Sequence, residues 1–136
     1  MSNLEQTLSS IKPDAVERKL DEEIKNMFRN KGFNILKEKK IQITKSEAEQ
    51  FYKVHQTKPF YNDLCEYLSS GPIVVMILEK ENAIRENRSL MGATNPKEAV
   101  DGTLRKKYGI SIDKNSVHGS DSLENAKIEI DFFFKD

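Results

Sequence analysis

Residues 73–78 read Ile-Val-Val-Met-Ile-Leu and form the longest apolar run of the chain. Both strand parities are apolar there, which is typical of a strand that is covered on both faces. We therefore predict the central strand of a sheet at this place. Helices should cover one of its faces, and we expect the other face to meet something else, for which a second subunit is a candidate. The run is far too short to span a bilayer.

The residues before this run predict a strand, a helix and a second strand. Residues 7–12 are expected to be extended, because Pro13 biases the residue before it toward extended backbone. From Pro13, apolar residues recur at spacings of three and four, which predicts one helix as far as about residue 30. Gly32 ends it. Residues 33–43 alternate between a mainly apolar and a polar set, as in a strand with one buried face.

Several short helices are predicted from their capping residues. Thr44 with Glu47 three positions later is a capping box, and a second helix follows Pro59. Asn82 and Asn95 are expected to cap the next two helices. Residues 110–115 should form a loop, Ser116-Val117 a short β step, and Gly119 a sharp turn. Asp121 and Ser122 are candidate caps for a last helix that runs to about residue 133.

This order of elements predicts the fold class. Strand, helix, strand, helix pair, strand, helices, short strand and helix indicate an α/β (α+β) protein. The expected architecture is a ferredoxin-like βαββαβ sandwich with a four-stranded antiparallel sheet covered by helices, placed to one side of the sheet. At 136 residues, we expect residues 1–136 to form a single domain.

Composition narrows the class of protein. The chain has 22 Lys+Arg and 22 Asp+Glu, so no global basic field favours nucleic-acid binding. Cys65 is the only cysteine, which excludes an intrachain disulfide and suits a reducing compartment. The first residues lack the basic-then-apolar pattern of a signal peptide. We expect a cytoplasmic protein with no membrane partner.

The candidate reactive group is an imidazole. The chain has two histidines, His55 and His118, and His118 lies between a short β step and a helix start, where anions such as phosphate collect. A neutral imidazole nitrogen is a nucleophile, although a lone histidine in a turn is more often structural. Glu129 borders the apolar stripe of the last helix. It either pairs with His118, which would fix the ring tautomer, or reaches solvent, and the two readings have equal weight.

Cationic side chains at other element ends could clamp a polyphosphate. Lys12 follows a strand, and Arg88 and Arg105 border the apolar sides of short helices. Guanidinium groups match phosphate oxygens in two-point geometry. Most such residues are merely solvated, so only the joint arrangement with Thr94 and Asn115 is informative. Tyr52 and Phe60 are at positions usual for core, although one exposed ring could stack on a nucleobase.

Other catalytic motifs are absent from the sequence. Neither G-x-x-x-x-G-K-[ST] nor G-x-G-x-x-G occurs, which argues against a P-loop kinase and a dinucleotide-binding protein. One cysteine and two histidines make a structural zinc site improbable. Ser120 and Ser122 lie near His118, but G-x-S-x-G is missing, which weakens a serine hydrolase interpretation.

Four blocks of the chain together resemble one family. NSVHGSDS, at residues 115–122, resembles the active-site signature N-x-x-H-G-S-[DA] of nucleoside diphosphate kinases. IKPDAVER (11–18), FYKVHQTKPFYNDLCEYLSSGPIVVMILE (51–79) and NRSLMGATNPKEAVDGTLRKKYG (87–109) match in order and at the family's spacing. The resemblance thus runs nearly end to end.

The resemblance implies transfer of the γ-phosphate of a nucleoside triphosphate such as ATP to a nucleoside diphosphate. The mechanism would be ping-pong, through a phosphohistidine. His118 matches the nucleophile and Glu129 the carboxylate that bonds its other nitrogen. Phe60 matches the aromatic on which the base stacks. The family's phosphate- and sugar-contacting positions correspond to Lys12, Tyr52, Arg88, Thr94, Arg105, Asn115 and Ser120.

The resemblance also implies partners. Substrates would be ATP, GTP, ADP, GDP and their deoxy forms, with Mg²⁺ carried on the nucleotide phosphates and no metal ligands from the protein. A homo-oligomer is expected. The chain is expected to lack the longer C-terminal tail that takes part in subunit contacts in some relatives, which leaves the choice between tetramer and hexamer open. Lys19 and Lys80 stand where the family pattern has glycine, and Lys106 where a small residue is usual. Ser9 and Ser10 make the first strand more polar than usual.

Two competing functions belong to other classes. One is a binding or regulatory module that keeps the fold and lacks activity, which the intact His118, Lys12, Arg88 and Arg105 set disfavours. The other is a nucleic-acid-binding protein, which the zero net charge disfavours.

Overall fold

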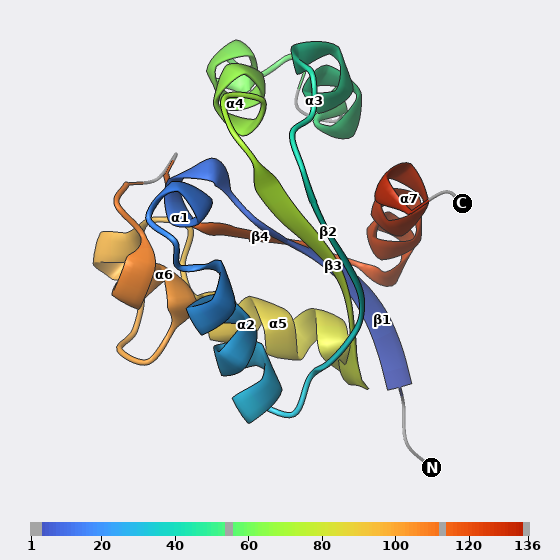
Figure 1. Cartoon of the computed structure of the whole chain (residues 1–136), viewed down its shortest axis with the longest axis vertical. Coiled ribbons are helices and arrows are strands. Elements are labelled where there is room, and N and C mark those ends of the chain that lie inside the picture. Colours follow the sequence, from blue (N-terminus) through green and yellow to red (C-terminus); the bar gives the residue numbers. More distant parts are fainter. Residues whose placement is uncertain (1–3, 54–55, 112–113, 135–136) are drawn as a thin grey trace.

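A computed structural model describes residues 4–53, 56–111 and 114–134, so that His55 lies outside the described residues. Four strands form one antiparallel sheet in the order β2-β3-β1-β4 (Figure 1). They are β1 (Leu4–Ile11), β2 (Asn34–Ile41), β3 (Ile73–Glu81) and β4 (Val117–Gly119). β3 is flanked by β1 and β2, and its first six residues are buried. The central strand predicted from residues 73–78 is therefore confirmed.

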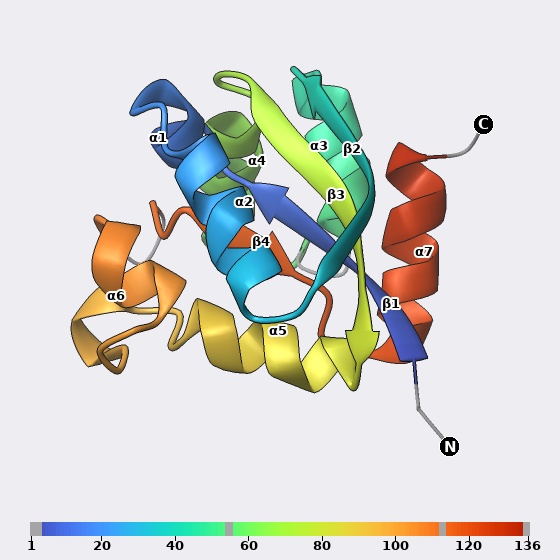
Figure 2. The same ribbon diagram turned by 60° about the horizontal axis from the view of Figure 1, so that its bottom comes forward.

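Helices of this same chain cover both faces of the sheet, as Figures 1 and 2 show from two directions. On one face, Val74, Met76 and Leu78 pack in a core with side chains from α1 (Pro13–Glu17), α2 (Asp21–Asn30), α5 (Ala83–Met91) and α6 (Leu104–Tyr108). On the other face, Ile73 and Val75 pack in a second core with side chains from α3 (Lys45–Phe51), α4 (Tyr61–Leu68) and α7 (Leu123–Phe133). The expectation of helices on one side only was wrong, because successive side chains of β3 point to opposite faces and each face has its own helices.

The single helix predicted from Pro13 to about residue 30 is two helices. α1 ends at Glu17 and α2 begins at Asp21, and between them Lys19 has a left-handed backbone with φ of 61°. Val16, Ile24 and Phe28 are nevertheless all buried in the same core. The apolar spacing continues across the break, so periodicity alone does not reveal it.

The structure has some of the predicted helix-capping hydrogen bonds and lacks another. The capping box is present, with Thr44 Oγ1 accepting from the N–H of Glu47 at 3.1 Å and Glu47 Oε1 accepting from the N–H of Thr44 at 2.9 Å. Asn95 caps the short 3₁₀ helix η2 (Pro96–Glu98). Asn82 is the N-cap residue of α5, as predicted, but its backbone is left-handed, with φ of 55°, and its side chain makes no capping hydrogen bond. Glu5 of β1 accepts the bond from the N–H of Ile84 instead.

In the described part of the chain, no helix combines the length and the apolar character needed to cross a membrane.

Candidate active site

The pairing of β1 with β4 determines which residues of the site lie next to each other. Ile11 lies opposite Val117, and Ser10 lies opposite His118. Just beyond this ladder, the N–H of Lys12 donates to the carbonyl of Ser116 at 2.8 Å. The predicted cation and the predicted nucleophile are therefore carried by neighbouring strands, at the place where β1 ends and β4 begins.

The backbone around His118 differs from the expectation at two residues. Ser116 has φ of 75°, so it is left-handed and is not part of a β step. Gly119 belongs to β4 and does not turn the chain. The turn thus comes before His118. After it, Ser122 caps α7 by accepting from the N–H of Asn125, as predicted.

His118 and Glu129 are in contact. His118 Nε2 lies 3.1 Å from Glu129 Oε1, and the Ser120 hydroxyl donates to the same oxygen at 2.8 Å. The side chains of His118 and Glu129 are 21% and 17% exposed, so the pair is mostly withdrawn from water. Of the two readings left open for Glu129, the structure has the pairing with His118. A proton shared at Nε2 leaves Nδ1 with the lone pair.

Aromatic rings surround the imidazole. Phe51 meets it edge-on, with ring centroids 5.1 Å apart and planes at 73°, and the Tyr52 centroid lies at 6.3 Å. Tyr52 is buried, and burial, followed by the charge of Glu129, raises the pKa of its hydroxyl far above the ordinary value. Tyr52 is therefore a neutral hydroxyl at physiological pH. Phe60 is 46% exposed, so it is the exposed ring of the two predicted aromatics.

Two cavities open on this region. One of about 320 Å³ is lined by Phe51, Tyr52, His118 and Glu129, among others. The larger one, of about 680 Å³, is lined by three residues predicted to bind phosphate, Arg88, Thr94 and Arg105. Asp121 lines both cavities. Among the described residues, Phe60 lines neither of these two cavities.

Arg105 is fixed between two segments of backbone. Its Nη1 donates to the carbonyl of Gly92 and its Nη2 to the carbonyl of Val117, both at 3.0 Å. Burial lowers the pKa of its guanidinium, and the like charge of Arg88 lowers it further, although an arginine stays protonated in proteins. Its Nε is buried without a hydrogen-bond partner among the described residues. A positive charge is thus held next to the strand that carries His118.

Lys12 reaches the same region through Asn115. Lys12 is buried, and its Nζ donates to Asn115 Oδ1 at 2.9 Å. The amide of Asn115 in turn donates to the carbonyl of Thr94 at 3.2 Å. This chain of contacts connects Lys12 to the wall of the larger cavity. The structure therefore brings together Lys12, Thr94 and Asn115, each of which is a weak candidate alone and which were predicted to act jointly.

Sequence reasoning missed a group of polar residues behind Ser116. The group contains Asp14, Arg18 and Tyr67. The spacing of four between Asp14 and Arg18 on a helix was a visible signal for an ion pair. Its connection to Ser116 was not visible, because 102 positions separate Asp14 and Ser116.

The three lysines that depart from the family pattern lie in different structural environments. Lys19 has a left-handed backbone, which accounts for glycine at that position in the pattern. Lys80 is in β3 and pairs with Glu86 at 2.8 Å, with its ammonium over the ring of Phe33. Lys106 is exposed on α6.

These features define a class of protein. An imidazole with one nitrogen paired to a carboxylate, next to fixed cations and an open cavity, suits an enzyme that transfers phosphoryl groups through a histidine.

Comparison with known proteins gives the family. The model of the family described as "Nucleoside diphosphate kinase" matches residues 5–136. A nucleoside diphosphate kinase of Campylobacter jejuni is 58% identical over 132 residues, which are 97% of this chain and 96% of the relative. The one of Persephonella marina is 55% identical over 97% of this chain and 94% of its own.

Solved structures agree. That of the nucleoside diphosphate kinase of Aquifex aeolicus superposes with a TM-score of 0.95 at 40% identity, covering 96% of this chain and 95% of its own. That of Encephalitozoon cuniculi gives 0.94 at 36% identity, covering 97% of this chain and 90% of its own. The chain belongs to the nucleoside diphosphate kinase family, and it is a phosphotransferase (EC 2.7.4.6) of nucleotide metabolism.

Proposed function

We propose that His118 Nδ1 is the atom that takes the γ-phosphate of a nucleoside triphosphate. Glu129 Oε1 holds Nε2 at 3.1 Å, which directs the lone pair to Nδ1. In-line attack forms the N–P bond while the bond from the γ-phosphorus to the bridging oxygen breaks, and the nucleoside diphosphate leaves. A second diphosphate then attacks the phosphohistidine, and ping-pong kinetics follow. The pairing of His118 with Glu129 inside a cavity is the observation that carries this proposal.

Cations around the cavities would bind the phosphates. Arg88 and Arg105 suit phosphate oxygens because of their planar fork, and Lys12 suits them as a point charge. Positioning and charge neutralisation contribute most of the catalysis in phosphoryl transfer. Arg105 is already fixed by two backbone carbonyls, so its charge needs no reorganisation during the reaction.

Neutral side chains would complete the site. The Tyr52 hydroxyl stays protonated and serves as a donor, and Ser120 keeps the Glu129 carboxylate in place through its 2.8 Å bond. Thr94 and Asn115 would contact phosphate and sugar. The exposed ring of Phe60 would stack on the base, and stacking accepts every base, so we expect ATP, GTP, ADP, GDP and their deoxy forms as substrates.

Mg²⁺ would arrive on the nucleotide. Among the described residues there is no group of three or more His, Cys, Asp or Glu that could hold a metal ion. A metal ion that is held by phosphate oxygens and water would need no cage of protein ligands. Bound in this way, Mg²⁺ supplies charge neutralisation at the phosphates.

The assembly is proposed to be a homo-oligomer, either a tetramer or a hexamer. β2 is an edge strand that pairs with β3, and the sheet order leaves its other edge without a strand among the described residues. Leu36 on this strand is 45% exposed. An exposed edge with an apolar side chain is suited to pairing with another chain. Sedimentation velocity measures the number of subunits directly.

We further propose one domain over residues 1–136 and a cytoplasmic location. The two cores share the strands of one sheet, which supports a single cooperative unit. The buried thiol of Cys65 is consistent with a reducing compartment.

The replacement His118→Ala tests the proposed mechanism. We expect the rate of phosphate transfer from GTP to ADP to fall by at least about 10³-fold, because the nucleophile is lost. A coupled assay for ATP measures this rate. The variant should keep its fold, since the His118 side chain belongs to neither core. Full activity in this folded variant would overturn the proposal and leave the family assignment in place.

A further inference from the structure

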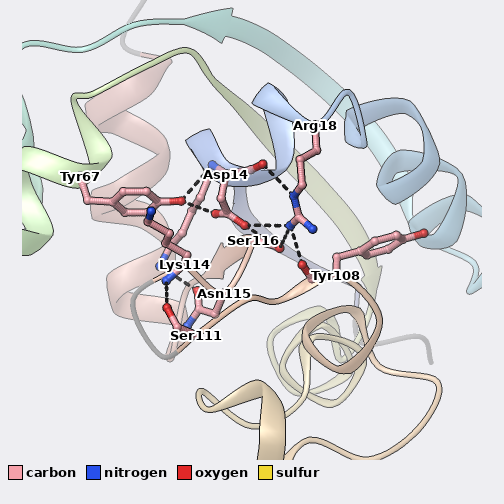
Figure 3. A network of polar contacts seen from close by, with 9 residues as sticks. Asp14, Arg18, Tyr67, Tyr108, Ser111, Lys114, Asn115 and Ser116 are labelled. Carbon is pink, nitrogen blue, oxygen red and sulfur yellow. Dashed lines mark hydrogen bonds and ion pairs between the residues drawn. The ribbon is translucent and has the colours of Figure 1, made fainter.

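A carboxylate is buried behind the site and belongs to none of the groups assigned above. The Asp14 side chain, on α1, is 3% exposed. Its Oδ2 accepts from the hydroxyl of Ser116 at 2.9 Å and from Arg18 Nη2 at 3.1 Å. Its Oδ1 accepts a short hydrogen bond from the hydroxyl of Tyr67. Figure 3 shows these three side chains converging on Asp14 from separate segments of the chain.

The partners of Asp14 are themselves held in place. Arg18 Nη2 also donates to the carbonyl of Tyr108 at 2.5 Å, and Arg18 Nε donates to the carbonyl of Asp14 at 3.1 Å. The N–H of Asp14 donates to the Tyr67 hydroxyl at 2.9 Å. A buried charge is unfavourable unless it is paired and hydrogen-bonded, and both conditions are met here. The carboxylate therefore acts as a fixed acceptor for Ser116.

Ser116, which the Asp14 carboxylate holds, has an unusual backbone conformation. Ser116 is fully buried and has φ of 75°, in a region of backbone conformation that residues other than glycine rarely adopt. The N–H of Val117 donates to the carbonyl of Asn115 at 2.9 Å, which closes a tight turn around Ser116. Such a backbone persists only where its surroundings determine it. The hydroxyl of Ser116 bonded to Asp14 is one such determinant.

The Ser116 turn carries the proposed machinery on both sides. Asn115, just before it, receives the Lys12 ammonium at 2.9 Å, and His118 follows two residues after it. The carbonyl of Ser116 also accepts from the N–H of Lys12. Lys12 and Asp14 are two residues apart at the start of α1, so the two sets of bonds to the turn are close together. A change of the backbone at Ser116 would move Asn115 and His118 relative to Lys12.

We propose that Asp14 is a positioning residue for phosphoryl transfer: its carboxylate, braced by Arg18 and Tyr67, holds the hydroxyl of Ser116 and thereby keeps the left-handed turn that places Asn115 and His118. The inference rests on the proposed roles of Lys12, Asn115 and His118. It assigns Asp14 no contact with the nucleotide. A displacement of about 1 Å far from the reacting atoms can reduce a rate by about 10²-fold, so a positioning residue of this kind has a measurable effect.

Glycine at position 116 separates this role from simple stabilisation. Glycine adopts positive φ without the steric penalty of a side chain, so the turn would then need no bond to Asp14. We expect Asp14→Asn to lower kcat at least tenfold while KM for ATP stays within threefold. Ser116→Gly should stay within threefold of wild type. The double variant Asp14→Asn/Ser116→Gly should have the kcat of Ser116→Gly. If Asp14 had only a structural role, glycine at position 116 would not restore the kcat that Asp14→Asn loses.

The experiment measures kcat, KM and the melting temperature of the full-length enzyme for Asp14→Asn, Ser116→Gly, Ser116→Ala and Asp14→Asn/Ser116→Gly. Ser116→Ala keeps a side chain at positive φ and removes only the hydroxyl, so its kcat should fall at least fivefold. Glu17→Gln is the matched control, because it removes a negative charge from an exposed residue of the same helix, and its kcat should not change.

Each result decides the inference. Loss in Asp14→Asn with recovery in the double variant supports it. An Asp14→Asn enzyme within twofold of wild type, or a loss that glycine does not correct, overturns it. If Asp14→Asn does not fold, Ser116→Ala decides, since that variant leaves the ion pair intact, and an unchanged kcat overturns the proposal. Phosphate on His118 of the wild-type enzyme is checked first, so that failure of the proposed mechanism is recognised separately.

Discussion

Ser116 and Gly119 lie on either side of Val117-His118, and each has the backbone that the other residue type would suggest. The serine is left-handed, with φ of 75°, whereas the glycine is in regular strand β4. Gly119 is needed for close approach instead: a Cβ there would lie 2.3 Å from Asn87 Nδ2 and 2.8 Å from Met91 Cε. One side of the histidine is thus set by side-chain hydrogen bonds, and the other by the packing of α5 against β4.

The difference teaches that the histidine is positioned by two unrelated kinds of constraint. Hydrogen bonds at Ser116 can be replaced by a residue that tolerates the turn. A side chain at position 119 instead requires the buried side chains of Asn87 and Met91 to move. Substitutions around the site should separate these two constraints.

Among the replacements that keep His118, Arg105→Ala should have the largest effect, because Arg105 serves both sides. Its Nη2 bonds the carbonyl of Val117, between the two flanks, and its charge lies next to the proposed phosphate site. We expect kcat/KM to fall by about 10²–10³-fold, the loss typical of removing a preorganised charge stabiliser. The coupled assay measures it. Unchanged turnover would show that Arg105 is a bystander.

Gly119→Ala should come next. The added Cβ must displace the side chains of both Asn87 and Met91, so we expect the free energy of unfolding to fall by about 1–3 kcal/mol and kcat to fall at least tenfold. Urea denaturation and the coupled assay measure the two effects. Adding Asn87→Ala should restore part of the stability, because it removes the nearest contact. A stable and fully active Gly119→Ala enzyme would contradict the packing constraint.

Glu129→Gln tests the side chain that orients the imidazole. The amide oxygen can still accept from Nε2, but the negative charge beside the ring is lost. We expect kcat to fall by about tenfold or more, with little change in melting temperature, because the positive charge that forms on the ring loses its counter-charge. Glu124→Gln, an exposed residue of the same helix, is the control and should retain full activity. Equal rates for the two variants would argue against the orienting role.

Lys19→Gly should have the smallest effect and should change stability alone. Lys19 is exposed and left-handed, with φ of 61°, so glycine should raise the free energy of unfolding by about 0.5–1 kcal/mol. The control is Lys31→Gly, at φ of −92°, where the same change should destabilise. Thermal denaturation distinguishes them. If both variants lose stability alike, the left-handed backbone at Lys19 carries no penalty.

Features encoded by neighbouring residues were predictable from the sequence. The apolar run at residues 73–78 predicted the central strand, and Thr44 with Glu47 predicted a capping box, because all the interacting groups are close along the chain. The pairing of Glu129 with His118 was within reach for the same reason, since 11 positions separate them.

Features that depend on distant segments were not predictable. The Ser116 turn relies on Asp14, 102 positions away, and the need for Gly119 arises from the packing of Asn87 against it. The break at Lys19 was hidden because the apolar spacing continues through it. The presence of helices on both faces of the sheet could not be predicted. The sequence of β3 shows that both faces are covered, but it does not show whether helices or another subunit cover them.

The most direct measurement is the identification of the phosphorylated atom. Enzyme treated with ATP and Mg²⁺ can be examined by mass spectrometry and by ³¹P NMR, which distinguishes the two ring nitrogens. The phosphate should be acid-labile, because it is attached through an N–P bond, and it should be on Nδ1 of His118, because Glu129 occupies Nε2. Phosphate on Nε2, or acid-stable phosphate on Ser120 or Ser122, would contradict the assigned geometry.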